Sequence, residues 1–440
     1  MNKFKNKKQF IFYLFFFLLA CIRFNVHYLH AANSRLSPFS SLSSFFFEME
    51  SVSSQENLIA ASLNSLQSRS TKNEIPPISS NASFHGRIAF YNVENLFDYF
   101  HDTTKKDKDF TPMGLKAWGK KKYEQKCINL FKVISDLNSQ NSLIAIGLAE
   151  VENDKVLRDL ILGTPLRYEK YAFIHYESAD PRGIDVAFLY DSSCLHIIES
   201  CAIPIIYPLD TLSYTRDILY VKARLFLKRP TIKSPSVERL SCIEKSSSTE
   251  VPFPKEEQSK ISNIDTIHFF VLHFPSKYAG ALSTDYKRRQ AGFTLRSAMD
   301  SISKKDPKAS IIVMGDFNGE PQEESLRESI GFDCISDISK ESTYLNLMCS
   351  FQGKEGSNKF HESWSIIDHF IINKSLLEHI RFRAAYLFKP SYLLMPDPTY
   401  LGQKTFRTFY GPKYLGGYSD HLPIYLDLEM KQEEKNLEKK

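Results

Sequence analysis

The sequence predicts an α+β sandwich, in which packed sheets form the centre and helices cover the outside. Apolar runs of strand length recur throughout residues 87–428, and only a few segments between them repeat apolar residues at helical spacing. Many strands with few interspersed helices are typical of sheets that pack on each other. The chain has 440 residues, of which 42% are hydrophobic and 24% charged, so it can bury a substantial core.

The individual elements follow from the periodicity of apolar residues. Strands that read as mostly buried are expected at 87–93, 143–148, 185–190, 267–273, 310–314, 366–372 and 424–428. Residues 219–225 alternate between apolar and more polar side chains, which predicts a strand with one face exposed to water. Apolar residues at helical spacing predict helices across 127–137 and 286–302.

The first 32 residues are expected to be an export signal. Residues 1–9 carry four lysines, and residues 10–22 form an uncharged apolar stretch. About 13 apolar residues fit the hydrophobic part of a secretory signal, whereas a membrane-spanning helix needs about 20. The sequence 18-LLAC resembles a bacterial lipoprotein box, which would leave a lipidated Cys21, and a conventional peptidase would instead cut near residues 31–32. An uncleaved short anchor is the third alternative.

If the chain is exported, we expect a bacterial protein that is periplasmic, attached to the cell surface or secreted. It would contact a membrane only through a lipid at Cys21. In an oxidising compartment cysteines form disulfides. Of the seven cysteines, six remain once Cys21 is removed or lipidated, and Cys194 and Cys201 are near enough in sequence to bridge a local loop. The absence of a Cys-x-x-Cys pair argues against a thiolate metal site.

The composition divides the chain into four parts. Residues 33–85, rich in Ser and Asn, are expected to be a flexible spacer. Strand-length apolar runs and helix-like segments alternate over 86–430, which predicts a folded domain there. Within that domain, residues 228–265 are dense in Ser, Lys, Glu and Pro and predict a disordered insertion. Residues 431–440 form a charged tail. The net charge of +5 permits a polyanionic partner without indicating one, and no obligate protein partner is inferred.

Polar residues that are able to do chemistry follow several of the predicted strands. A single such residue is more often a turn or a helix cap, but their recurrence at six strand ends is harder to dismiss. Carboxylate and amide oxygens suit Mg²⁺, Mn²⁺ or Ca²⁺, and histidine moves protons near neutral pH. A hard cation beside a histidine–aspartate pair can hydrolyse a phosphate ester, because the cation neutralises phosphoryl charge and the histidine transfers protons. The residues are Asn92, Glu150, His273, Asp316, Asn318, Asp368, Asp420 and His421.

A series of short motifs resembles the endonuclease/exonuclease/phosphatase superfamily, and the resemblance spans roughly residues 86–430. The combination of Gly-Asp-x-Asn with a later Ser-Asp-His-x-Pro is its most specific part. The resemblance implies a four-layered α/β/β/α sandwich of the deoxyribonuclease type. The motifs occur in the order 91-YNVENLFD, 147-GLAEVEN, 181-PRGIDVAFLYD, 272-LHFPSK, 315-GDFNGEP, 366-IIDHFIIN and 416-GGYSDHLP.

The resemblance also implies a metal site. Glu150 would be the principal ligand, with Asn92 beside it and Asp420 helping to bind or orient the ion. Glu94 would support the site. The cation would be Mg²⁺ or Mn²⁺, with Ca²⁺ as another candidate.

The catalytic residues implied by the resemblance surround that site. His421 would contact the scissile phosphate or activate water, and Asp368 would fix its tautomer. Asp316 and Asn318 would hold the nucleophilic water and the phosphate. His273 matches a second histidine of the secreted deoxyribonuclease branch, where it assists at the leaving group.

Substrate binding is predicted at Arg182 and Lys277, with Arg216 as a further phosphate-binding candidate. For Arg182 and Arg216 the alternative is a plain surface salt bridge. Lys277 stands where related bacterial sequences often have Arg, so the charge is kept but the bidentate fork is lost. Asp185 is a candidate for orienting His273. Histidines without motif context, His175 and His369 among them, read as surface or structural residues.

The resulting hypothesis is an exported, divalent-metal-dependent phosphodiesterase, specifically a nuclease acting on DNA or RNA. The alternative is a phosphoesterase acting on phospholipid or sugar phosphate, since a fold does not specify a substrate. A non-catalytic surface binding protein on the same fold is a third hypothesis, and the retention of every candidate ligand and histidine argues against it.

Overall fold

The computed structural model describes residues 85–139, 141–226, 266–278, 280–338 and 342–430. The predicted signal (1–32), the insertion (228–265), the tail (431–440) and all but the last residue of the spacer (33–85) lie outside the described residues. Among the helices that are described, none combines the length and apolar character needed to span a membrane.

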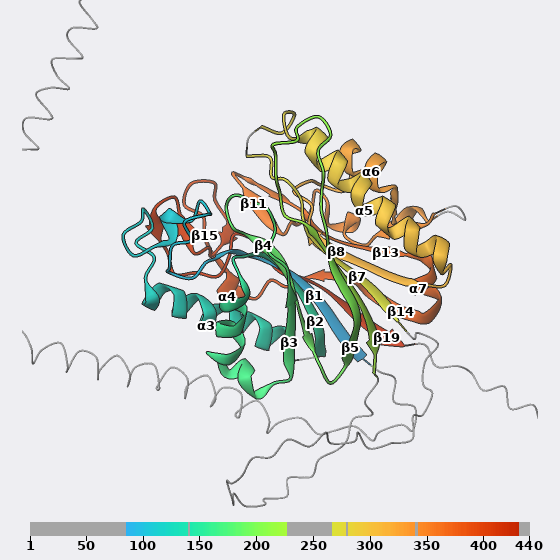
Figure 1. Ribbon diagram of the computed structural model, residues 1–440, viewed down its shortest axis with the longest axis horizontal. Coiled ribbons are helices and arrows are strands. Elements are labelled where there is room, and N and C mark those ends of the chain that lie inside the picture. The colour runs from blue at the N-terminus through green and yellow to red at the C-terminus, as the bar shows by residue number, and fades with distance from the viewer. Residues whose placement is uncertain (1–84, 140, 227–265, 279, 339–341, 431–440) are drawn as a thin grey trace, which may run out of the picture. The chain divides into compact units, whose positions relative to one another are not determined.

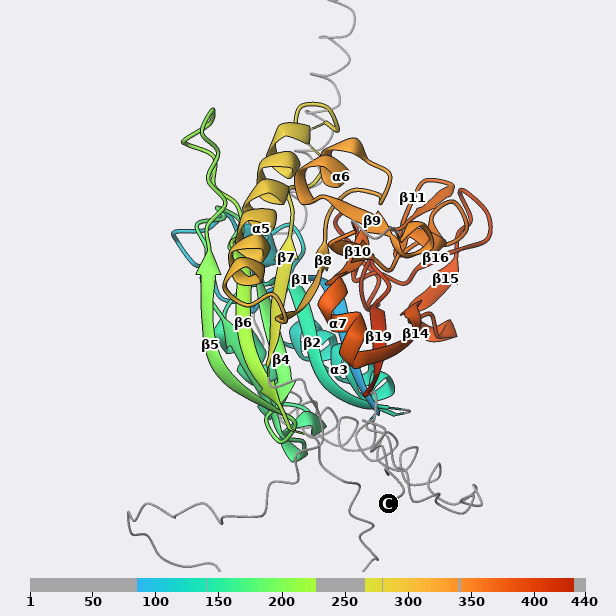
Figure 2. The same cartoon turned by 90° about the vertical axis from the view of Figure 1, so that its right-hand side faces the viewer.

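Two large mixed sheets form the centre of the domain, as Figure 1 and Figure 2 show. The six-stranded sheet has the order β14-β19-β1-β2-β4-β3, and the seven-stranded sheet has the order β5-β6-β7-β8-β13-β10-β9. The first contains β1 (His85–Leu96), β2 (Ser142–Val151), β3 (Tyr171–His175), β4 (Asp185–Asp191), β14 (Ile380–Leu387) and β19 (Ile424–Met430). The second contains β5 (Leu195–Ile203), β6 (Ile218–Leu225), β7 (Ile267–His273), β8 (Ser310–Asp316), β9 (Phe332–Cys334), β10 (Tyr344–Asn346) and β13 (Asp368–Asn373).

Helices cover the outer faces of both sheets, so the predicted four-layered sandwich is confirmed. Figure 1 shows α3 and α4 on one side of the sheets and α5 and α6 on the other. The helices are α3 (Lys120–Leu137), α4 (Asp154–Leu162), α5 (Asp285–Lys305), α6 (Glu324–Ile330) and α7 (Lys374–His379). Three short hairpins lie outside the main sheets: β11–β12 (Asn358–Phe360, Ser363–Ser365), β15–β16 (Leu394–Pro396, Gln403–Thr405) and β17–β18 (Phe409–Tyr410, Lys413–Tyr414).

The hydrophobic core follows from the alternation of side chains along the strands. On β1, Ile88 and Phe90 belong to the core between the two sheets, whereas Ala89 and Tyr91 belong to the core that also contains residues of α3 and α4. Successive side chains of a strand point to opposite faces, so a strand covered on both faces is apolar throughout. This is why β1 reads as a continuous apolar run. A third cluster joins the seven-stranded sheet to α5, through Leu295 among others.

All strands and both helices predicted from periodicity are present. Their ends shift by three residues or fewer, except that the helix expected at 127–137 begins at Lys120. The strand expected at 366–372 is β13, which begins at Asp368. Helix α4 was not predicted. It begins after Asn153, whose side chain accepts a hydrogen bond from Val156 N at 3.0 Å, the typical N-cap arrangement. The partly polar strands β5 and β14 also escaped the analysis of apolar runs.

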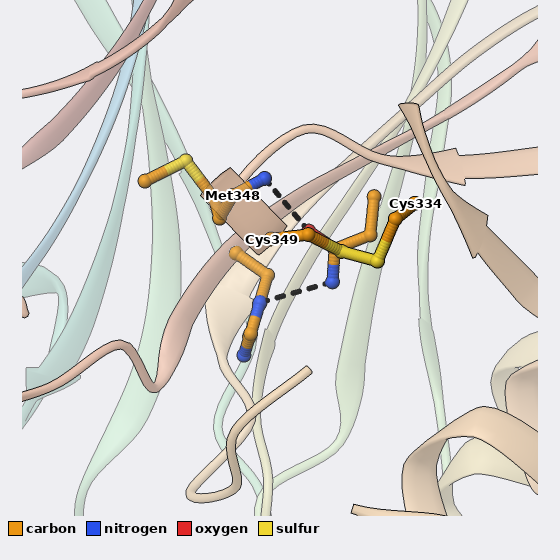
Figure 3. Close-up of a disulfide and its surroundings, with 5 residues drawn as sticks. Cys334, Met348 and Cys349 are labelled. Carbon is orange, nitrogen blue, oxygen red and sulfur yellow. Dashed lines mark hydrogen bonds between the residues drawn. A yellow bond between two sulfur atoms is a disulfide. The ribbon is translucent and has the colours of Figure 1, made fainter. Parts of the chain in front are cut away.

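The disulfide expected between Cys194 and Cys201 is wrong. Cys201 lies within β5 and Cys194 immediately before it, and an extended strand holds residues seven apart well beyond disulfide reach. The disulfide instead joins Cys334, at the end of β9, to Cys349, with the Cα atoms 5.8 Å apart (Figure 3). It ties two loops at the edge of the seven-stranded sheet, which lie together only because the strands pair.

Candidate active site

Strand pairing places three of the predicted residues in one row across the seven-stranded sheet. Asp316, the last residue of β8, is paired with His273 of β7 on one side and with Asp368 of β13 on the other. Paired residues on neighbouring strands point to the same face of a sheet. The pairing therefore gathers two carboxylates and an imidazole, although they come from segments far apart in the sequence.

The six-stranded sheet supplies the other half of the site. Asn92 of β1 donates from Nδ2 to Asp316 Oδ2 at 3.1 Å and, more weakly, to Glu150 Oε1 at 3.4 Å. Glu150 lies in a β-bulge, because the ladders of β2 with both β1 and β4 skip it. Bulges re-aim side chains beside active sites. Asn92 thus links the carboxylates of the two sheets.

The backbone around the site adopts conformations that most residues avoid. Four non-glycine residues of the site have positive φ: Glu94 (50°), Asn95 (53°), Glu150 (65°) and Asn318 (50°). Such conformations cost about 1 to 3 kcal/mol each and persist where the surroundings hold them. Here hydrogen bonds do so: Asn95 N donates to Glu150 Oε2 at 2.8 Å, and Asn318 N donates to Asp316 Oδ1 at 2.8 Å. No apolar pattern in the sequence signals this strain.

Two histidines approach a single carboxylate oxygen. Oδ2 of Asp316 lies 3.6 Å from His273 Nε2 and 3.7 Å from His421 Nε2. His421 is also hydrogen-bonded through Nδ1 to Asp368 Oδ2 at 2.8 Å. All four side chains are almost fully buried. The arrangement places the predicted histidine–aspartate pair and the second histidine around one oxygen atom.

The charges of the site move the pKa values of its groups in different directions. Burial favours a neutral ring, but the carboxylates of Asp368 and Asp316 outweigh it and raise the pKa of His421 well above its usual range. Burial, together with the cation of Arg216, lowers the pKa of His273 well below its usual range. Burial also raises the pKa of Asp316 to about 7. The two histidines therefore differ in charge at neutral pH.

The expectation that Asp185 orients His273 is wrong. Asp185 accepts a hydrogen bond from Ser178 N at 3.1 Å, and its other oxygen faces His175 Nε2 at 3.5 Å. Nδ1 of His273 is buried without a hydrogen-bond partner among the described residues. Asp185 begins β4, where it is paired with Val151 of β2, and its side-chain carboxylate contacts Ser178 and His175.

Arg407 is a site residue that the sequence analysis missed. Its Nε donates to Glu94 Oε1 at 3.0 Å and its Nη2 to Asp420 Oδ2 at 2.9 Å. Burial would raise the pKa of Asp420, but Arg407 and then His421 lower it below its usual value. The available signal was an arginine in the segment leading to 416-GGYSDHLP. Arg407 holds Glu94 and Asp420 together at the edge of the site.

The predicted substrate-binding residues lie in different surroundings. Arg182 is 46% exposed and pairs with Asp180, and Lys277 is 38% exposed and pairs with Glu323. Both keep exposed surface from which they can reach an anion. Arg216 is buried, donating to Asp180 Oδ2 at 3.2 Å and to Phe274 O at 2.8 Å. Arg216 is therefore held inside the protein, where it supports the segment after His273.

Asn318 and His369 are both tied to the backbone near the site. Asn318 donates from Nδ2 to Phe274 O at 3.0 Å, which leaves its Oδ1 for another partner. His369 is buried, with Nε2 2.8 Å from Gly319 O and Nδ1 3.0 Å from Asn346 Nδ2. These contacts agree with the prediction that His369 is structural, since it holds the loop that carries Asn318.

The donor set fits a hard divalent cation. Asp316, Asp368 and His421 each offer one ligand atom, and these atoms lie within 4.8 Å of one another. Glu150 is linked to Asp316 through Asn92, and Asp420 precedes His421 in the chain, so both add carboxylates beside this group. Oδ1 of Asp368 is buried without a hydrogen-bond partner in the described structure. Such an excess of carboxylate oxygens suits Mg²⁺ or Mn²⁺. When bound, the ion would neutralise charge on the phosphoryl oxygens.

Asn92 directs its Nδ2 group, not its oxygen, at the carboxylates. Its Oδ1 accepts a hydrogen bond from Glu94 N at 3.1 Å. The role of Asn92 as a metal ligand therefore stays a prediction.

A second group of potential metal ligands is formed by His175, Glu177 and Asp185, whose ligand atoms lie within 4.8 Å of one another. In it, His175 Nδ1 is 2.9 Å from Asp154 Oδ1. The sequence analysis did not identify this group.

A model of the Endonuclease/Exonuclease/phosphatase family matches residues 87–231 and 258–430, more than half of the chain. The search of curated proteins finds no match.

Solved structures similar to this chain include an endonuclease/exonuclease/phosphatase family protein from Bacteroides thetaiotaomicron, with 14% identity and a TM-score of 0.46 over 80% of this chain and 99% of that one. A mannosyl-6-phosphatase of Bacteroides thetaiotaomicron VPI-5482 has 15% identity and a TM-score of 0.44 over 78% and 98% of the two chains. The human Nocturnin catalytic domain, with bound sulfate, has 14% identity and a TM-score of 0.43 over 79% and 95%.

Proposed function

Because this chain belongs to the endonuclease/exonuclease/phosphatase family, whose members are typically metal-dependent phosphoesterases and nucleases, we propose that it is an exported phosphodiesterase that cleaves DNA or RNA. Mg²⁺ or Mn²⁺ is the proposed cation, held by Glu150 and Asp420 with Asn92 beside them. His421, Asp368, Asp316, Asn318 and His273 are the proposed catalytic residues, and Arg182 and Lys277 are proposed to contact the substrate.

The observation that carries the proposal is the approach of His273 and His421 to the same oxygen of Asp316, at 3.6 and 3.7 Å. Hydrolysis of a phosphodiester needs a group that accepts a proton from water and a group that supplies one to the leaving oxygen. Paired groups whose pKa values are pushed apart are typical of such acid–base roles. With its raised pKa, His421 can donate a proton to the leaving oxygen, whereas His273 is held neutral and can accept one from water. This exchanges the roles that the resemblance implied for the two histidines.

The proposal is tested by incubating the full-length purified protein with plasmid DNA and with RNA in Mg²⁺ or Mn²⁺. Cleavage that EDTA abolishes is expected. His421→Asn should lose nearly all activity, and His196→Asn, at an exposed position of β5, serves as the matched control. Unchanged activity of His421→Asn would contradict the mechanism.

A substrate panel separates this proposal from the alternative esterases. Choline phospholipids and sugar phosphates should be hydrolysed far more slowly than nucleic acid. If one of them is the better substrate, the family assignment stands but the proposed substrate does not, since residues of the same kind serve different phosphoesters on one fold.

Export is proposed from residues 1–32 and has its own test. The protein should be recovered outside the cytoplasm when its cells are fractionated. Labelling with radioactive palmitate, followed by comparison with Cys21→Ser, distinguishes a lipidated protein from one cut near residues 31–32. Recovery of full-length protein in the cytoplasm alone would contradict export.

A further inference from the structure

A polar pocket of about 220 Å³ adjoins the proposed metal site. It is contiguous with the site because Asn95, in its wall, donates its backbone N–H to Glu150 Oε2 at 2.8 Å. Arg407, also in the wall, binds Asp420 at 2.9 Å. The pocket is lined by Glu94, Asn95, Phe110, Lys116, Arg407, Phe409 and Gly411 and is called the Lys116 pocket below. None of these residues has a role in the proposed reaction beyond that of Glu94 and Arg407 in supporting Asp420.

The wall of the Lys116 pocket carries two cations and one anion. Glu94 is the anion, and its carboxylate is already occupied by Arg407 and by the backbone N–H of Thr408. Lys116 donates one hydrogen bond, to Gly411 O at 2.9 Å. An ammonium group has three donors, so Lys116 retains capacity for a ligand. Arg407 is paired with both Glu94 and Asp420, whereas Lys116 forms no ion pair among the described residues. The ammonium group of Lys116 therefore favours an anionic occupant.

The aromatic side chains of the pocket pack against the ammonium group of Lys116 and against other rings, so they are not free to stack on a base. Nζ of Lys116 lies 4.4 Å from the ring centroid of Phe409 and 5.4 Å from that of Phe110. Phe409 is buried and packs on Trp118 and Tyr414 at centroid distances of 5.6 and 5.3 Å. The rings therefore position the ammonium group through cation–π contacts.

The volume of the pocket limits its occupant. Pockets that enclose drug-sized ligands measure about 300 to 1,000 Å³, and this one is smaller. A compact tetrahedral anion fits such a space better than a nucleoside. Because the pocket adjoins the metal site, one substrate molecule can reach both with neighbouring phosphates.

We propose that the Lys116 pocket binds a second phosphate of the substrate, next to the phosphodiester that is cleaved. The inference rests on the proposed function and narrows it to substrates in which phosphates follow one another, as in a polynucleotide or an oligonucleotide with a terminal phosphate. A charge-assisted hydrogen bond to phosphate contributes about 1.5 to 3 kcal/mol, which corresponds to about a tenfold or larger preference for the phosphorylated substrate.

The test compares dinucleotides that differ only in a terminal phosphate: dTpdT, pdTpdT and dTpdTp, with the full-length protein and Mn²⁺. At least one phosphorylated form should have a kcat/KM about tenfold or more above that of dTpdT. In Lys116→Met this ratio should fall towards one, and in Lys116→Arg it should be largely kept. Lys132→Met is the matched control. Nζ of Lys132 also makes a cation–π contact, 3.9 Å from the ring centroid of Tyr392, but Lys132 does not line the pocket.

The outcomes separate this inference from the proposed function. Cleavage between the nucleosides with the same ratio in wild type and Lys116→Met would overturn the Lys116 pocket and leave the phosphodiesterase intact. Removal of the terminal phosphate without cleavage would overturn the proposed function and with it the inference. No reaction with any of the three would overturn the inference, while the assays with plasmid DNA and RNA decide the proposed function. An equal fall of the ratio in Lys132→Met would also contradict the assignment to Lys116.

Discussion

Nδ1 of His421 lies 2.8 Å from Oδ2 of Asp368, and this hydrogen bond joins the two sheets of the sandwich. Asp368 begins β13 of the seven-stranded sheet, and His421 stands in the segment that leads into β19 of the six-stranded sheet. The proposed catalytic pair therefore exists only when the sheets are packed on each other. Its chemistry depends on the same packing that holds the fold.

Asp368→Asn should lower kcat by about 10²- to 10⁴-fold, in the range typical of lost acid–base assistance. Asparagine keeps the shape but removes the charge that raises the pKa of His421. The measurement is steady-state kinetics across pH, with Glu355→Gln as a control because Glu355 is an exposed carboxylate paired with Lys389. A kcat equal to that of the wild type would show that the pair has no part in the reaction.

Metal binding should stabilise the wild type and not Glu150→Gln. At a Mg²⁺ concentration of 100 times Kd, the expected gain is about 2.7 kcal/mol, measured as a rise in thermal midpoint. Glu177→Gln tests the other group of potential ligands, formed by His175, Glu177 and Asp185. If Glu177→Gln abolishes the rise and Glu150→Gln does not, the ion binds at that second group instead.

The buried His369 should make the protein less stable in mild acid. Burial lowers the pKa of His369 from 6.5 to about 4. As the pH falls, the unfolded chain therefore takes up this proton first, so the stability is fully present above pH 6.5 and is lost as the pH falls towards 4. The loss from this residue is up to about 3 kcal/mol.

His369→Gln provides the comparison, because glutamine can still donate to Gly319 O but does not titrate in this range. Urea unfolding at a series of pH values should show a smaller loss of free energy between pH 6.5 and 4 in the variant than in the wild type. Parallel curves for the two proteins would mean that His369 titrates normally in the folded state.

Reduction of the Cys334–Cys349 disulfide should destabilise the domain. The bond closes a loop with a sequence separation of 15, for which the loss of chain entropy in the unfolded state is worth about 3 kcal/mol. Chemical denaturation with and without dithiothreitol measures the effect. Cys349→Ser should behave like the reduced protein, and Cys201→Ser, at an exposed position in β5, should not change the difference.

Most strands of the two sheets could be predicted from the sequence, because the pattern of apolar residues that indicates a strand is local. Strands covered on both faces contain uninterrupted apolar runs, such as 88–91 in β1 and 311–314 in β8, and a polar residue such as Asn92 or Asp316 stands out after such a run. The α4 helix was missed because its nine residues span only two to three turns, too few for a clear periodic signal.

The partners within the site were decided by tertiary structure. Asn92 and Asp316 are 224 residues apart, and Arg407 and Glu94 are 313 apart, so no periodicity links them. Asp185 and His273 illustrate the reverse, since Asp185 was expected to orient His273 but contacts Ser178 and His175 instead. Which strands are neighbours depends on the pairing of the whole sheet.

The amino-acid sequence by itself determined the apolar strands, the helices α3 and α5 and the kinds of side chain available for chemistry, because each of these depends on neighbours along the chain. Sheet order, the bulge at Glu150 and the packing of one sheet on the other decided which oxygen faces which imidazole. Distances of a few ångströms between remote segments are set by the packing of the core and not by spacing in the chain.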